Sequence, residues 1–161
     1  MVTVLGSCIA ACIRDPIAQV GGMNHFLLPD SVNAGDSPLR YGAYSMEKLI
    51  NDIMKKGGMK NRLEVKIFGG GNVIESSAMI GDKNVKFIHE YLAQEGLRIA
   101  EQDVGGKSPR RIHYYPDSGK VMMRKIASKD DLENVKKEER SYSKKISTRS
   151  SHGDEGDVEV F

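Results

Sequence analysis

A cysteine and a histidine near the start of the chain have the side chains needed for nucleophilic catalysis. Cys8 follows Gly6 and Ser7 in "VTVLGSCIAACIRDP", and His25 comes seventeen residues later, within "QVGGMNHFLL". A free thiol has a pKa of about 8.5 and is mostly protonated at neutral pH, but an adjacent imidazole can accept its proton and stabilise the thiolate. The pair could therefore attack a carbonyl or amide carbon in an acyl-transfer reaction.

The two residues before the cysteine favour a tight turn. Backbone N–H groups in such a turn could point at an oxyanion, and each well-placed donor contributes about 3 to 4 kcal/mol to transition-state stabilisation. A cysteine in an apolar strand is more often a small core residue, so spacing alone leaves both roles open for Cys8. Cys12 has no comparable partner and is expected in the core.

A metal site formed by Cys8, Cys12 and His25 is disfavoured by their spacing. The C-x-x-x-C pattern along a strand spreads its ligands, and no second pair of cysteines completes a structural zinc site. No metal and no cofactor is expected.

A β-hairpin is expected to position the cysteine and the histidine. The segments "IAACIR" and "AQVGGMNHFLL" have strand character and flank "DPIA", in which proline favours a turn. If this loop closes symmetrically, Arg14 pairs with Gln19, and Cys8 lies directly opposite His25 on one face. The same register lines that face with mostly small side chains, which predicts close packing by a helix.

The remaining patterns predict two helices, further strands and a second hairpin. Apolar residues recur at helical spacing in 44–58 and 82–96, and strand patterns occupy 62–72, 97–106, 110–115 and 120–126. The glycines of "FGGGN" match neither a dinucleotide-binding loop nor a P-loop, so they predict a packing turn. The chain is therefore expected to have an α/β fold with two main helices.

Length and charge limit the class of protein. The 161 residues suit one domain, and 24 Lys and Arg against 22 Asp and Glu give no electrostatic case for a nucleic-acid partner. No apolar run approaches the roughly 20 residues of a membrane-spanning helix, and the start lacks a signal-peptide pattern. These features predict a cytoplasmic protein without membrane insertion.

The composition changes near residue 128. The segment 128–161 is rich in Lys, Glu, Ser and Asp and poor in large apolar residues. Such a composition buries too little apolar surface to offset the entropy of ordering. We therefore predict a folded domain over 1–127 and a charged tail over 128–161 that is disordered or loosely helical.

Several segments together resemble the chemoreceptor glutamine deamidase family, CheD. They are "LGSC", then "GGMNHFLLP", "YGAYSMEKLI", "KIFGGGNVI", "IGDKNVKFIHEYL" and "DVGGKSPRRIHYYPDSGKVMMRKI", and the similarity runs from Thr3 to about Ile126. The resemblance implies a layered α/β sandwich with a mixed or antiparallel sheet. It also implies an enzyme that converts selected receptor glutamines to glutamate and releases ammonia.

The resemblance also implies roles for individual residues. Cys8 corresponds to the family's nucleophile and His25 to its histidine. The family's third catalytic residue is a threonine six residues before the cysteine, where this chain has Val2. Thr3, one residue nearer, takes that role only if a bulge or the turn before Cys8 changes the direction of its side chain.

Partners and side activities follow from the same resemblance. Methyl-accepting chemotaxis receptors are the expected protein substrate, with glutamyl methyl ester hydrolysis as a further activity of the same acyl-enzyme route. A CheC-type phosphatase is an expected partner, and family members carry an additional N-terminal segment. The alternative is a non-catalytic adaptor that binds receptors or the phosphatase and in which Cys8 is only packed.

Overall fold

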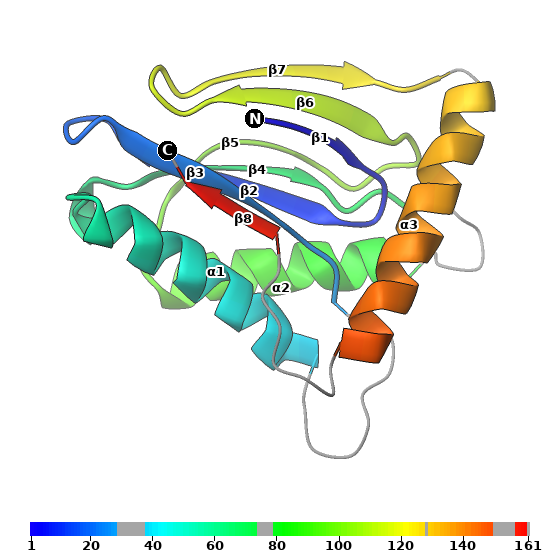
Figure 1. Ribbon diagram of the computed structural model, residues 1–161, viewed down its shortest axis with the longest axis horizontal. Helices are drawn as coiled ribbons and strands as arrows, with labels where there is room; N and C mark the ends of the chain where they lie inside the picture. Colours follow the sequence, from blue (N-terminus) through cyan, green and yellow to red (C-terminus); the bar gives the residue numbers. More distant parts are fainter. Residues whose placement is uncertain (29–37, 74–78, 128, 150–156, 161) are drawn as a thin grey trace.

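The strands of the computed structural model form two sheets (Figure 1). The structure describes residues 1–28, 38–73, 79–127, 129–149 and 157–160. In the three-stranded sheet the order is β1 (Val2–Leu5), β6 (Arg110–Tyr115) and β7 (Lys120–Lys125). In the five-stranded sheet it is β5 (Ile99–Val104), β4 (Glu64–Gly69), β2 (Ile9–Asp15), β3 (Val20–Phe26) and β8 (Asp157–Val160).

In the described part of the chain, three α-helices accompany the sheets: α1 (Pro38–Lys55), α2 (Ile80–Gln94) and α3 (Lys129–Arg149). A short 3-10 helix, η1 (Lys60–Arg62), precedes β4. Helix α1 begins at a proline, whose fixed φ suits the first helical position. It ends at Lys55, and the φ of 98° at Gly57 allows the N–H of Gly58 to reach the carbonyl of Ile53.

Helices α1 and α2 cover one face of the five-stranded sheet. Because strand side chains alternate, the odd-numbered residues of β2 point toward these helices. This core contains Ile9, Ile13, Phe26, Val65, Ile67, Met46, Leu49, Ile53, Phe87, Ile88 and Leu92. Helix α2 also connects β4 to β5, which pair in parallel, as a crossover between parallel strands requires.

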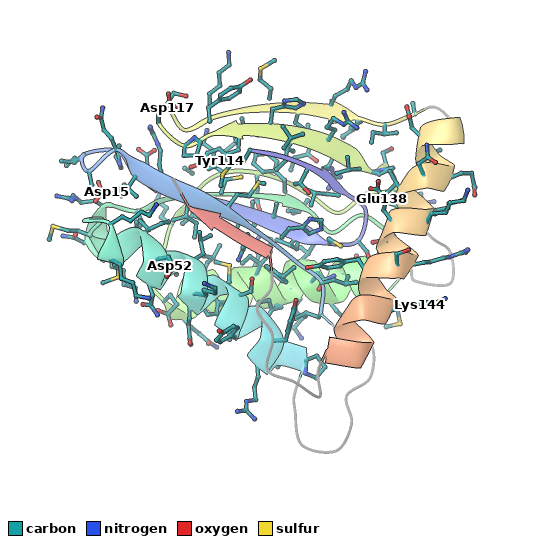
Figure 2. The ribbon with its side chains drawn as sticks, in the orientation of Figure 1. Asp15, Asp52, Tyr114, Asp117, Glu138 and Lys144 are labelled. Atoms are coloured by element: carbon teal, nitrogen blue, oxygen red, sulfur yellow. The ribbon has the colours of Figure 1, made fainter. Side chains whose placement is uncertain are left out.

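The opposite face of the five-stranded sheet packs on the three-stranded sheet. This second core contains Cys8, Ala10, Cys12, Met23, Phe68, Leu5, Ile112 and Tyr114, and Tyr114 lies between the sheets in Figure 2. The face that carries Cys8 was predicted to pack against a helix, and that prediction is wrong. The small side chains instead allow close approach of a second sheet.

The α/β sandwich is confirmed, in three layers of helices, a mixed five-stranded sheet and an antiparallel three-stranded sheet. The third α-helix lies in the segment predicted to be disordered or loosely helical, and its packing against the sheets was not expected. Helix α3 stands at one end of the two sheets, close to the chain segment that joins β1 to β2 (Figure 1). No helix among the described residues is both long and apolar enough to cross a membrane.

The register of the first hairpin differs from the symmetric prediction by two residues. Asp15 pairs with Val20 and Ala10 pairs with His25, so Cys8 is diagonal to His25 and not directly opposite it. The cause is Asp15, whose Oδ1 accepts hydrogen bonds from the backbone N–H groups of Ile17 and Ala18 at 2.9 and 3.0 Å. Because a shift of two residues keeps every side chain on its face, Cys8 and His25 still share one face.

The predicted disorder of the tail does not hold for 129–149, which form α3. Leu132, Val135, Glu139 and Tyr142 lie on one side of this helix at spacings of three and four residues and are buried or half-buried. The next described segment, β8, pairs antiparallel with β3. Residues 128, 150–156 and 161 of the predicted tail lie outside the described residues, and the division at residue 127 stays a prediction.

Asp15 is a buried charge at the hairpin end of the molecule, opposite α3 (Figure 2). Its Oδ2 accepts hydrogen bonds from the backbone N–H of Met59 and from Nε of Arg62, both at 2.8 Å. Burial alone would raise the pKa of the Asp15 carboxyl. The hydrogen bonds from Ala18, Met59 and Arg62 outweigh it and hold the pKa below its ordinary value of 3.8.

Asp15→Asn is expected to lower the free energy of unfolding at pH 7. The amide group would present a donor to Met59 and Arg62, which themselves donate. Because the folded-state pKa is depressed, the ionised carboxyl stabilises the fold fully above about pH 5. This contribution begins to decrease as the pH falls below the ordinary pKa of 3.8 and is lost as the pH falls through the lower folded-state pKa. Urea unfolding at pH 7 and pH 3 should therefore show a smaller difference between variant and wild type at pH 3. An equal difference at both pH values would contradict this role.

Candidate active site

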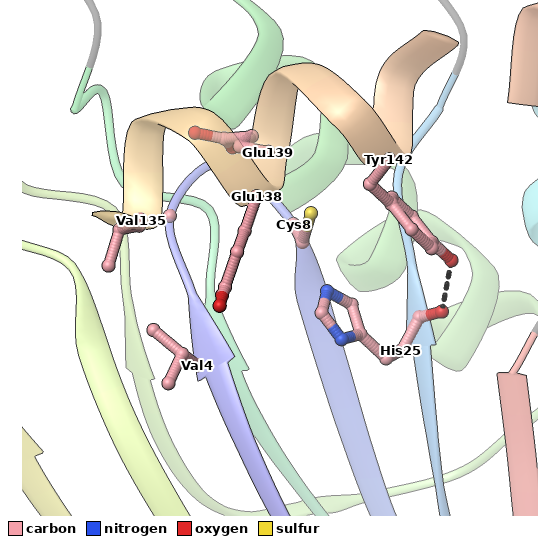
Figure 3. Close-up of a pocket in the computed structure, with 8 residues that line it drawn as sticks. Val4, Cys8, His25, Val135, Glu138, Glu139 and Tyr142 are labelled. Carbon is pink, nitrogen blue, oxygen red and sulfur yellow. Dashed lines mark hydrogen bonds between the residues drawn. The ribbon is translucent and has the colours of Figure 1, made fainter. Parts of the chain in front are cut away.

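A cavity of about 170 Å³ opens at the end of the sheets beneath α3 (Figure 3). The turn before β2, strands β1 and β3, and α3 each contribute to its walls. The lining residues are Val4, Gly6, Cys8, His25, Val135, Glu138, Glu139 and Tyr142. Two of the three residues singled out from the sequence therefore lie in one cavity.

The cysteine lies where the chain passes from one sheet to the other. Strand β1 belongs to the three-stranded sheet and β2 to the five-stranded sheet, and Gly6 and Ser7 form the bend between them. Cys8 immediately precedes β2, with its side chain directed toward the second core. This is the tight turn expected from the Gly-Ser pair.

A glycine turn and a buried asparagine hold this bend in place. The N–H groups of Gly70 and Gly71 donate to the carbonyls of Cys8 and Gly6 at 2.7 and 2.8 Å. At Gly69, whose φ is 112°, an added Cβ would lie 2.0 Å from the Cys8 carbonyl oxygen, so only glycine fits. The "FGGGN" segment is thus a packing turn, as predicted, and it supports the residues around Cys8.

Asn84 of α2 links the cysteine turn to the end of β3. This fully buried side chain donates from Nδ2 to the carbonyl of Ser7 at 2.8 Å and accepts at Oδ1 from the N–H of Leu28 at 2.9 Å. Because Leu28 follows the strand that carries His25, Asn84 fixes the spacing between the two segments that supply the cysteine and the histidine.

Thr3 lies within hydrogen-bond distance of the histidine. The distance from Thr3 Oγ1 to His25 Nδ1 is 2.9 Å. Strand β1, which carries Thr3, lies in a different sheet from β2. The alternation of side chains along β2 therefore does not determine which way Thr3 points, and Thr3 can reach His25. The structure thus brings Thr3, Cys8 and His25 together, with the change of direction supplied by the bend at Gly6 and Ser7.

The cysteine thiol is shielded from solvent. Cys8 is only 4% exposed. Burial raises the pKa of its thiol well above the ordinary value, and the negative charge of Glu139 raises it further, while a backbone hydrogen bond at Cys8 acts in the opposite direction. In this conformation the thiol is therefore mostly protonated at neutral pH. Cys12 is 1% exposed and lies in the core, as expected.

Glu139 of α3 reaches the residue that precedes the cysteine. Its Oε1 accepts a hydrogen bond from the backbone N–H of Ser7 at 2.5 Å and another from the Ser7 hydroxyl. Glu139 is 8% exposed, and a Cβ at Gly6 would lie 2.6 Å from its Oε2. The Glu139 carboxylate therefore binds at the Gly6–Ser7 bend, and the absence of a side chain at Gly6 leaves the space that this carboxylate needs.

Tyr142, one helical turn further along α3, covers the histidine. Its ring stacks on the His25 ring with centroids 5.2 Å apart, and its hydroxyl donates to the His25 carbonyl at 2.9 Å (Figure 3). Helix α3 thus contacts both segments of the cavity that carry candidate catalytic side chains.

Sequence reasoning did not identify Asn84, Glu139 or Tyr142. Asn84 interrupts the apolar pattern of a helix, and a polar residue at a core-facing position is the signal that could have singled it out. Tyr142 is an aromatic residue in an otherwise polar segment, and it lies seven residues after Val135. Glu139 carries no signal at all, because one glutamate in a charged helix resembles its exposed neighbours.

Among the described residues, no group of three or more His, Cys, Asp or Glu side chains could hold a metal ion. The two cysteines are both free thiols. The polar side chains that line the cavity are a thiol, an imidazole, two carboxylates and a phenol, from Cys8, His25, Glu138, Glu139 and Tyr142.

Comparison with known proteins gives a consistent result. Residues 27–125 match the family model described as "CheD chemotactic sensory transduction". A relative from Rhodopseudomonas palustris (strain BisA53), named "Probable chemoreceptor glutamine deamidase CheD", is 53% identical over 150 residues, which cover 91% of this chain and 70% of the relative.

Two further relatives bear the same name. The protein from Hahella chejuensis (strain KCTC 2396) is 47% identical over 99% of this chain and 76% of its own length. The protein from Caulobacter sp. (strain K31) is 46% identical over 100% of this chain and 83% of its own length. These alignments extend over nearly the whole chain, beyond the range of the family model.

Proposed function

Since the chain belongs to the CheD family, we propose that it is a protein-glutamine deamidase that acts on chemotaxis receptors. The reaction hydrolyses the side-chain amide of selected receptor glutamines to glutamate and releases ammonia. The names of the relatives support the receptor substrate. We further propose that the reaction takes place in the cytoplasm and needs no cofactor.

Cys8 is the proposed nucleophile and His25 the proposed base. His25 takes the thiol proton, the Cys8 sulfur attacks the glutamine amide carbon, and His25 returns the proton to the nitrogen that leaves as ammonia. The backbone N–H of Ser7 is the proposed donor to the substrate's amide oxygen, and its hydrogen bond to the carboxylate of Glu139 supports this role. A thioester then joins Cys8 to the receptor.

Water completes the reaction. His25 removes a proton from a water molecule that attacks the thioester carbon, and Cys8 leaves as the product glutamate forms. A glutamyl methyl ester would enter the same route with methanol as its leaving group. The ester hydrolysis implied by the family resemblance is therefore part of the proposal.

One observation carries the assignment: Cys8 and His25 line the same cavity, and Thr3 Oγ1 lies 2.9 Å from the Nδ1 of His25. A threonine at Nδ1 fixes the orientation of the ring and directs Nε2 to proton transfer with the thiol. The arrangement of nucleophile, base and orienting group is the one that cysteine-dependent acyl transfer uses.

The test is mass spectrometry of a chemoreceptor incubated with the purified full chain. Each glutamine that is deamidated gains about one dalton, because an amide nitrogen is exchanged for a hydroxyl oxygen. Ammonia release should match the number of converted sites. A receptor that gains no mass and releases no ammonia, with the enzyme in molar excess, would refute the proposed function.

Thr3→Val is expected to lower kcat by about fivefold, since one neutral hydrogen bond contributes about 1 kcal/mol. Valine has nearly the same shape as threonine but cannot hold the His25 ring. Thr3→Ser, which keeps the hydroxyl, is the matched control and should retain most of the rate. Steady-state ammonia release measures both, and equal rates for the two variants would remove Thr3 from the mechanism.

A non-catalytic adaptor is the second candidate function, and the burial of Cys8 is the observation that favours it. An adaptor would bind receptors or a CheC-type phosphatase, the partner that the family resemblance implies. It would bind a receptor without changing its mass, so the receptor experiment separates the two functions.

A further inference from the structure

We propose that α3 is an internal lid on the Cys8 cavity, held closed by Glu139 and Tyr142, which a receptor segment must displace to be modified. This inference deepens the proposed function and rests on it for the identity of the competing substrate. Its steric part, that α3 limits access to Cys8, stands on the contacts of α3 alone.

The first argument is the position of α3. Four of the eight lining residues belong to this one helix: Val135, Glu138, Glu139 and Tyr142. The opposite wall is formed by residues of the turn and of β1 and β3. In Figure 3 the helix lies above Cys8, and Cys8 is only 4% exposed, so α3 and its side chains help to screen the sulfur from a protein substrate.

The second argument is the chemistry of Glu139. Its side chain is the product side chain of the proposed reaction, and its carboxylate rests on the N–H and hydroxyl of Ser7, next to Cys8. A receptor glutamine would need these donors for its own amide oxygen. Glu139 therefore occupies the subsite that a substrate side chain would take.

The third argument is that the closed helix suppresses the nucleophile. Cys8 is 4% exposed under α3, and both this burial and the charge of Glu139 raise the pKa of its thiol. A permanently closed α3 would leave little reactive thiolate. Release of α3 removes both effects together.

The fourth argument is that the attachment of α3 is small enough to be reversible. Of its residues with described side chains, only Val135 and Glu139 are buried, whereas Tyr142 is half-buried. A contact surface with so few buried apolar side chains opens at much lower free energy than the layered core. A substrate that binds only the open form would then shift the population toward it.

Alkylation of Cys8 by iodoacetamide in the full chain tests the steric part directly. Tyr142→Ala is the principal variant, because it weakens the lid without changing a charge near the thiol. We expect Cys8 to label about tenfold faster than in the wild type, as judged by peptide mass spectrometry. Tyr44→Ala, at an exposed tyrosine of α1, is the matched control and should label at the wild-type rate.

Glu139→Ala is the second variant and should also speed the labelling of Cys8. Its matched control is Glu133→Ala, an exposed glutamate of α3 that pairs only with Lys136 among the ion pairs of the described residues. Cys12 is the internal control, since it lies between the sheets and does not line the cavity under α3. Labelling of Cys8 that is unchanged in both lid variants would overturn the proposal.

Misfolding has a separate signature in the same experiment. If Cys12 labels faster in Tyr142→Ala, the core of that variant is no longer intact. The milder variant Tyr142→Phe then tests the lid. It keeps the stacked ring and loses only the hydrogen bond to His25, and it should label Cys8 several-fold faster. A Tyr142→Phe variant with an intact core and the wild-type rate would contradict the lid.

Receptor kinetics test the regulatory part. If α3 must open before the substrate binds, the apparent affinity for the receptor is reduced in proportion to the fraction of molecules that are open. Tyr142→Ala increases that fraction, so it should lower KM with kcat unchanged. Faster labelling combined with a lower kcat would instead show that α3 is a part of the active site needed for catalysis, and it would overturn the role of α3 as a lid. If neither wild type nor variant modifies receptors but labelling still rises, the proposed function fails while the steric inference stands.

Discussion

Cys8→Ser is expected to lower receptor deamidation by roughly four orders of magnitude, with receptor binding retained. A serine hydroxyl has a much higher pKa than a thiol, and His25 cannot activate it to the same extent. The measurement is ammonia release from a chemoreceptor, with receptor binding followed in parallel by co-sedimentation. Binding without turnover identifies a disabled enzyme.

Cys12→Ser is the matched control for this prediction. This variant also replaces a cysteine sulfur with oxygen. Cys12 lies four residues further along the chain and on the same face of the sheet as Cys8, but it does not line the cavity. Activity within a few-fold of wild type is expected once the fraction of folded protein is matched. If Cys8→Ser keeps near-wild-type activity, or if Cys12→Ser loses as much, Cys8 is not the nucleophile.

His25→Gln is expected to lower kcat by about 10² to 10⁴-fold, the usual contribution of a positioned general base. Glutamine keeps a polar side chain of similar length but cannot exchange protons with Cys8. His113→Gln is the control, because His113 is half-buried on β6 and does not line the cavity.

The pH dependence of the residual activity adds a second readout for His25. Without a base, the rate depends on spontaneous ionisation of Cys8, whose pKa is raised by burial and by Glu139. Below a raised pKa the thiolate fraction grows about tenfold per pH unit. The His25→Gln rate should therefore climb steadily from pH 7 to pH 9, whereas the wild-type rate should level off. Parallel pH profiles would show that His25 is not the base.

The sequence was sufficient for the shared face of Cys8 and His25 but not for their register. Side chains alternate along a strand, so any even shift of the hairpin preserves the face. The shift itself depends on Asp15, whose carboxylate binds the loop on one side and η1 on the other. The contacts on the η1 side join Asp15 to residues more than forty positions away in the sequence. Rules for turns consider only neighbouring residues, so they cannot predict these contacts.

Thr3 shows a second limit of local reasoning. Counting along a single strand places Thr3 on the wrong face for His25, and this count fails because the strand is not continuous. The chain leaves the three-stranded sheet at Leu5 and enters the five-stranded sheet at Ile9. Glycine and serine at the bend indicate a turn, but they do not indicate a change of sheet.

The docking of helix α3 on the cavity was not predicted, because the contacts of this helix are largely polar. Hydrophobic periodicity detects helices that bury an apolar stripe, and α3 places a glutamate in the middle of its buried side. The Ser7 donors that receive this carboxylate lie 132 residues earlier in the chain. A charged helix of this kind becomes predictable only when the site beneath it is known.

The pairing of β8 with β3 has a consequence for how α3 competes with a receptor. Strand β7 precedes α3 and β8 follows it, and both are held in sheets, so the helix is tethered at each end. A displaced α3 therefore stays near the cavity, because a segment joined at both ends to the body of the protein has an effective concentration of roughly mM order. Receptors packed into dense arrays would present a comparable local concentration of their own segments, whereas the same receptors diluted in solution would not. The enzyme would then respond to the clustering of its substrate as well as to its amount.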